Sequence, residues 1–124
     1  MSQARKEKKL NKDERRHMLF SYGDGEYIEG TKRIKGQIIL SEHKLYLRGP
    51  EGDIATTYIP LEKIEKIRKV GNNLEVHVRQ SILERYVAAL TGEKKHLADL
   101  IKDIVERRGL RKKNFWTQEW AERE

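Results

Sequence analysis

Several kinds of residue are scarce or missing in this chain of 124 residues, and each shortage excludes a class of protein. The chain has no cysteine, which excludes a disulfide framework, a thiolate metal site and a cysteine nucleophile. It has only two prolines, so it is not a proline-rich linker. Its apolar runs are short, as at 38–40, whereas a membrane-spanning helix needs about 20 apolar residues. No apolar stretch follows the basic N-terminus, so we expect no signal peptide.

Charge is abundant instead, and it is concentrated at the two ends. The chain has 27 lysines and arginines against 20 aspartates and glutamates, a net charge of +7. Residues 1–17 have seven basic and three acidic side chains, residues 107–124 have six and three, and residues 18–106 have 14 of each. We therefore predict a basic, disordered arm at 1–17, a globular domain at 18–108 and a basic, aromatic tail at 109–124. Such arms attract polyanions, among them nucleic acids, anionic membranes and acidic proteins.

The middle of the chain has the pattern of short strands separated by turns. Apolar residues alternate with polar ones over Leu45–Leu47 and again over Leu74–Val78, which is typical of half-buried strands. Gly71–Asn73 predicts a hairpin turn, because glycine and asparagine tolerate positive φ. Gly23–Gly25 predicts another turn, between two separate strands.

Two stretches permit more than one secondary structure. Leu61, Ile64 and Ile67 are spaced by three, which fits either a short helical turn or a bulged strand. Residues 82–90 match the helical period better than the strand period, with a stripe made of Ile82, Leu83, Tyr86, Val87 and Leu90.

The segment that follows predicts an amphipathic helix of about four turns. Thr91 is a suitable N-cap, and Gly109 is a suitable residue to follow the C-terminus. Apolar residues recur at i, i+3, i+4, i+7 and i+8, namely Leu97, Leu100, Ile101, Ile104 and Val105. Such a stripe predicts a helix that covers one side of a sheet.

Three segments resemble a pattern of pleckstrin-homology-like (PH-like) and GRAM domains: Gly36–Ser41, Leu45–Leu47 and Ile59–Ile64. The archaeal chemotaxis adaptors of the CheF family have a similar run near their N-terminus. Arg85–Ala89 and the helix resemble the last strand and the helix of a PH domain, so the resemblance favours a strand at 82–90. It implies a mainly β fold, a PH-like β-barrel of about seven antiparallel strands capped by one C-terminal amphipathic helix.

Cations near the first predicted hairpin form one candidate site. PH domains that bind phosphoinositides have basic residues around the loop between their first two strands, and Lys32, Arg33 and Lys35 are near the matching place. Such cations grip phosphate groups through charge-assisted hydrogen bonds. Only Arg33 and Lys35 approximate the family's pair on the second strand, so ordinary solvated cations are the alternative.

The tail forms a second candidate site. Both tryptophans of the chain, Trp116 and Trp120, lie there next to Phe115 and directly after Arg111, Lys112 and Lys113. On a helix the two rings would share a face and make a good anchor. Three alternatives are open: the tail packs back on its own domain, docks into a partner, or lies on a membrane.

Signatures of catalysis are missing from the sequence. No two histidines have the i, i+3 or i+4 spacing of metal ligands on a helix, and they are His17, His43, His77 and His96. Neither a nucleophile elbow nor a phosphate-binding glycine motif occurs. Asp99 and Asp103 share the polar face of the predicted helix. We therefore expect a protein that is not an enzyme and needs no cofactor or metal.

These features suggest three functions for a cytoplasmic protein. The first is a PH/GRAM-like binding module that acts as a protein-interaction adaptor in signalling or motility, with the six tail residues in contact with the partner. The second is peripheral binding to anionic lipids at the inner membrane face through Lys32, Arg33, Lys35 and the same tail. The third is nucleic-acid binding through the basic arms and a helix-turn-helix at 82–108.

Overall fold

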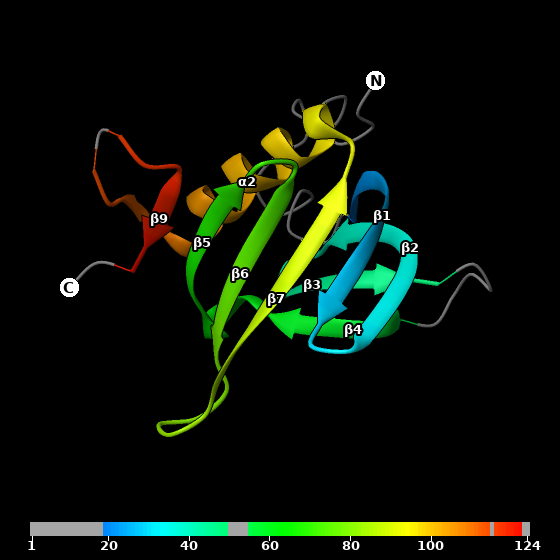
Figure 1. Ribbon diagram of the computed structural model, residues 1–124, viewed down its shortest axis with the longest axis horizontal. Coiled ribbons are helices and arrows are strands. Elements are labelled where there is room, and N and C mark those ends of the chain that lie inside the picture. The colour runs from blue at the N-terminus through cyan, green and yellow to red at the C-terminus, as the bar shows by residue number, and fades with distance from the viewer. Residues whose placement is uncertain (1–18, 50–54, 115, 123–124) are drawn as a thin grey trace.

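The computed structural model describes residues 19–49, 55–114 and 116–122, so the predicted arm at 1–17 lies outside the described residues. One antiparallel sheet and one α-helix make up the described part of the chain (Figure 1). The mainly β fold with one amphipathic helix is therefore confirmed. The elements, in chain order, are β1 (Phe20–Glu29), β2 (Lys32–Leu40), β3 (Lys44–Arg48), β4 (Ala55–Pro60), the 3-10 turn η2 (Leu61–Lys63), β5 (Ile64–Val70), β6 (Asn73–Arg79), β7 (Arg85–Gly92), α2 (Lys94–Arg108), β8 (Arg111–Lys112) and β9 (Glu119–Ala121).

The sheet curls around a single hydrophobic core. Its strand order is β4-β3-β2-β1-β7-β6-β5-β9-β8. β1 joins two wings, because it pairs with β2 along its length and with β7 along its second half. Side chains from both wings belong to one buried cluster, among them Ile38 of β2, Leu47 of β3, Ile67 of β5 and Val76 of β6.

Glycines lie side by side where the two wings meet. Gly25 of β1 is paired with Gly36 of β2 on one side and with Gly92 of β7 on the other. A Cβ at Gly25 would overlap the carbonyl oxygen of Thr91 and come within 2.7 Å of Ile38 Cδ1. The strands can approach this closely and bend around the core only because these positions have no side chain.

The helix α2 covers the core as its apolar stripe predicted. Four of the five stripe residues are buried, and Val105 packs against the same cluster. Gly109 ends the helix with a φ of +65°, as the sequence predicted, whereas the N-cap is Glu93 rather than Thr91, since Thr91 belongs to β7. In the part of the chain that the structure describes, no helix is long and apolar enough to cross a membrane.

A bulge inside β1 replaces one predicted turn. The register of β1 against β2 shifts between Ser21 and Asp24, and Gly23 has a φ of +81°. The prediction that Gly23–Gly25 separates two strands is therefore wrong. A glycine at positive φ permits the chain to bend within one strand that pairs on both sides of the bulge.

Residues 85–92 form a strand, so the helical interpretation of 82–90 is wrong and the strand alternative is confirmed from Arg85 onward. β7 pairs with β6 from Arg85 to Thr91 and also with β1. Tertiary pairing on both edges outweighs the helical periodicity, which treated Ile82 and Leu83 as core residues although both are exposed. The helix-turn-helix at 82–108 consequently lacks its first helix.

The stretch 61–67 combines its two predicted alternatives. Leu61–Lys63 forms the 3-10 turn η2, and the register of β5 then shifts between Ile64 and Lys66. The hairpin turn predicted after this stretch is confirmed, with a φ of +61° at Gly71.

The sheet is open, whereas the resemblance implied a closed barrel. β4 forms one edge and β8 the other, and no ladder joins these edges within the described residues. The strand count is nine rather than about seven, because the segment after α2 contributes β8 and β9. The seven strands that precede α2 account for the rest of the sheet.

We predict that Gly25→Ala lowers the free energy of unfolding by about 2–3 kcal/mol, because a rigid backbone carbonyl must move to admit the methyl group. Gly92→Ala is the matched control, since its Cβ would meet no atom closer than 3.5 Å, and it should cost less than about 1 kcal/mol. Urea denaturation of both variants tests this, and equal losses would contradict the close approach at Gly25.

Candidate functional site

The tail folds back and extends the sheet as a small hairpin. β8 pairs with β9, and β9 pairs with β5, with Trp120 opposite Ile67. Two further backbone hydrogen bonds bracket this ladder: Lys69 N–H donates to the Gln118 carbonyl at 2.8 Å, and Glu122 N–H to the Glu65 carbonyl at 2.9 Å. We call residues 111–121 the tail hairpin. Of the three alternatives for the tail, packing on its own domain is the one that the described residues adopt.

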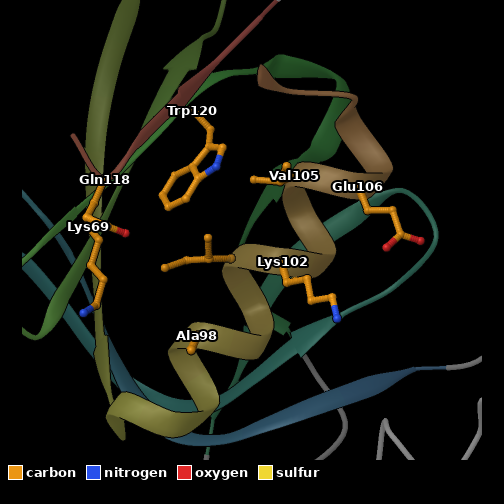
Figure 2. Close-up of a pocket in the computed structure, with 8 residues that line it drawn as sticks. Lys69, Ala98, Lys102, Val105, Glu106, Gln118 and Trp120 are labelled. Atoms are coloured by element: carbon orange, nitrogen blue, oxygen red, sulfur yellow. The ribbon is translucent and has the colours of Figure 1, made fainter. Parts of the chain in front are cut away.

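Trp120 lies in a groove between the tail hairpin and α2 (Figure 2). Its ring is half-buried and packs against the core cluster, and Lys112 Nζ lies 5.9 Å from the ring centre. The groove has a volume of about 540 Å³ and is lined on the helix side by Ala98, Ile101, Lys102, Val105 and Glu106. We call it the helix groove.

Trp116 takes the opposite orientation and is 85% exposed. It lies in the loop between β8 and β9, where Asn114 Oδ1 accepts hydrogen bonds from the N–H groups of Trp116 and Thr117, both at 2.9 Å. The two tryptophans therefore do not share a helical face, since one packs inward and the other outward. Phe115, the third predicted aromatic contact, lies outside the described residues.

Two acidic residues of the tail, Glu119 and Glu122, are paired with cations of the sheet and helix. Glu122 accepts from Arg79 at 2.9 Å and from Arg108 at 2.8 Å, and Glu119 lies 3.9 Å from Lys66. The Glu65 hydrogen bond and the nearby Glu122 charge raise the pKa of Arg79. Arg108 also donates two hydrogen bonds to the Ile64 carbonyl, so it ties the helix end to the start of β5.

The predicted tail cations lack such compensation. Arg111 and Lys112 form β8, and Lys113 follows directly, its N–H donating to the Glu119 carbonyl at 2.9 Å. Their side chains are exposed, and none of the three forms an ion pair with another described residue. The tail hairpin thus has an exposed indole in its loop and three exposed cations in or directly after β8.

The three cations of β2 do not converge on one point. Arg33 lies 3.6 Å from Glu26. Lys32 lies 5.8 Å from the Tyr27 ring centre and 3.4 Å from Thr57 Oγ1. Lys35 is opposite Glu26 in the ladder. The predicted anion site is therefore a dispersed set of exposed cations, partly offset by a carboxylate.

Two tyrosines near the same hairpin titrate abnormally. Tyr27 donates a 2.5 Å hydrogen bond to Glu29. Burial, followed by this hydrogen bond and the Glu29 charge, raises the pKa of Tyr27. Burial and the same carboxylate raise the pKa of Tyr86. Both phenols therefore lose their proton less readily than an exposed tyrosine does.

No group of three or more histidine, cysteine, aspartate or glutamate side chains within the described ranges could hold a metal ion. His77 lies 3.3 Å from Glu75, and His96 lies 3.8 Å from Glu93. Glu75 also lies 3.5 Å from Arg68.

Sequence reasoning missed two features of the surface. Ile82 and Leu83 are 86% and 92% exposed, although periodicity had assigned them to a buried stripe. The turn-forming pair Gln80-Ser81 just before them is the signal that could have ended the apolar stretch there. The Arg79–Glu122–Arg108 cluster joins residues far apart in the chain, and no sequence pattern pairs them.

Comparison with known proteins gives no relative from which to transfer a function. No protein-family model matches the chain, and none of the curated proteins compared with it is similar in sequence.

We predict that the two tryptophans contribute differently to stability. Trp120→Ala should lower the free energy of unfolding by about 1–2 kcal/mol, because it removes a half-buried ring from the helix groove. Trp116→Ala should change it by less than about 0.5 kcal/mol, as expected for an exposed side chain. Urea denaturation tests both, and a large loss for Trp116→Ala would mean that its ring packs on the domain.

Proposed function

We propose that this chain is a PH-like or GRAM-like binding module that acts, without catalysis, as a protein-interaction adaptor. The strand order supports a PH-like arrangement. β1 belongs both to a wing with β2, β3 and β4 and to a wing with β7, β6 and β5, and a helix follows β7. A common core between the wings is consistent with a barrel-like interior. The run shared with archaeal chemotaxis adaptors favours a role in signalling or motility.

The tail hairpin is the docking site in this proposal, and the exposure of Trp116 is the observation that carries it. Large aromatic rings are enriched among the residues that dominate protein interfaces. The ring costs little to order on binding, because Asn114 and the β9–β5 ladder already fix its loop. A tryptophan held outward on a fixed hairpin suits a pocket on another protein.

The positive charge of the tail hairpin indicates what kind of partner surface it would bind. Arg111, Lys112 and Lys113 belong to the same hairpin as Trp116 and form no ion pair with a described carboxylate, whereas Glu119 and Glu122 are paired. Unpaired cations on the same hairpin as an apolar contact favour a partner with acidic residues near an apolar pocket. The helix groove next to Trp120 gives a partner side chain a second apolar contact.

The test starts from a photo-reactive amino acid at position 116 of the full chain, in the cells that encode it. Position 58 is the matched control, because Tyr58 is exposed and lies on β4, the edge strand at the other end of the strand order from β9 and β8. We expect a specific acidic protein to be cross-linked from position 116 and not from position 58.

Affinity measurements with the cross-linked protein then test the role of the indole. Trp116→Ala should weaken binding by about 100-fold, as for a central interface tryptophan. Lys113→Glu should weaken it and reduce its salt dependence, whereas Lys95→Glu, a reversal on an exposed position of α2, should leave it unchanged. Unchanged affinity of Trp116→Ala would refute the proposed docking site.

A further inference from the structure

The hairpin between β6 and β7 projects beyond the strands on both of its sides. Its last ladder pair is Arg79 opposite Arg85. On one side β5 begins opposite Val78, and on the other the last pair with β1 is Ile28 opposite Ala89. Residues 79–85 therefore extend about 10 Å past their neighbours, and the loop stands clear of the body in Figure 1.

Two aliphatic side chains, Ile82 and Leu83, lie at the end of this projection, and they are more exposed than any other large apolar side chain of the described residues. Hydrogen bonds close the loop below them: the N–H groups of Gln80 and Ser81 donate to the Glu84 carbonyl at 2.8 and 3.1 Å. Glu84 N–H donates to Ser81 Oγ at 3.1 Å. The loop is thus fixed with its apolar pair directed outward, and we call residues 80–84 the apolar tip.

Cations lie at the same end of the molecule. The turn between β1 and β2 leads into Lys32 and Arg33, and β1 ends beside the β7 residues that run toward the tip. Arg79 and Arg85, at the base of the tip, share the carboxylate of Glu65. Ser81 holds the one acid of the tip, Glu84, at 3.4 Å.

We propose that the apolar tip inserts into the interfacial region of an anionic lipid bilayer. On a rigid protein, a convex tip can bury its side chains only in a pocket of matching shape. A fluid bilayer rearranges around the tip, so no preformed pocket is needed. The projection of about 10 Å matches the depth of about 5–10 Å at which amphipathic elements bury their apolar residues in a bilayer. Lys32 and Arg33, which follow the turn between β1 and β2, lie toward the same end of the molecule and attract anionic headgroups.

The two proposed sites lie at opposite ends of the sheet. The hydrogen bond between Lys69 and Gln118 places the loop that contains Trp116 next to the Lys69 end of β5. The apolar tip lies beyond the other end of β5, past Ile64. Membrane attachment by the tip therefore leaves the tail hairpin open to a protein partner, and neither proposal depends on the other.

Vesicle sedimentation with the full chain tests the tip. We expect binding to vesicles of phosphatidylcholine mixed with phosphatidylglycerol, and weaker binding to phosphatidylcholine alone. Ile82→Ser combined with Leu83→Ser should lower the partition coefficient by about 100-fold or more, because each of the two buried aliphatic side chains contributes at least about tenfold. Val70→Ser is the matched control, an exposed aliphatic at the opposite end of β5, and should bind as the wild type does.

Lys32→Gln combined with Arg33→Gln should lower binding only to vesicles that contain phosphatidylglycerol. Introducing the reporter Leu83→Trp into Trp116→Phe should give an emission that shifts to the blue when these vesicles are added. A wild-type chain that does not sediment with either kind of vesicle would overturn the proposal. So would a serine double variant that binds as the wild type does, since the lipid contact would then lie elsewhere.

Discussion

An edge strand leaves a row of backbone N–H and C=O groups without partners, and β5 would be such an edge if the sheet ended before the tail. β9 covers it, with hydrogen bonds that run from Glu65 to Lys69. Trp120 enters the helix groove as a consequence, and Glu122 reaches Arg79 and Arg108. The same pairing fixes the loop that presents Trp116. One ladder of three residue pairs thus connects the sheet, the helix and the exposed indole.

The molecule combines a rigid body with two exposed apolar points. The glycines at the joint let two wings share one core, and α2 covers that core with its apolar stripe. From this body the tail hairpin presents Trp116, and the β6–β7 hairpin presents Ile82 and Leu83 at the opposite end. Hydrogen bonds hold the backbone of both loops. In the two proposals, this separation lets a protein and a membrane surface bind at the same time.

Local sequence patterns predicted most of the fold. They failed where pairing between strands far apart in the chain determines the secondary structure. The stripe from Leu97 to Val105 predicted α2, and the alternation over Leu74–Val78 predicted β6, because each pattern states which face is buried. Residues 82–90 misled the periodicity count, since ladders with β6 and β1 fix β7. In the site, the sequence identified the aromatic and basic tail. It could not predict that Trp120 is packed and Trp116 is exposed, because their orientations follow from the pairing of β9 with β5.

The most direct measurement is the tryptophan emission and acrylamide quenching of two variants of the full chain, Trp116→Phe and Trp120→Phe. Each variant has a single tryptophan, because the chain contains only two. The arrangement of the tail hairpin predicts blue emission and weak quenching from Trp120, and red emission and strong quenching from Trp116. Red emission from both would mean that β9 does not hold the tail on β5. Blue emission from both would mean that Trp116 is packed on the domain and is not presented to a partner.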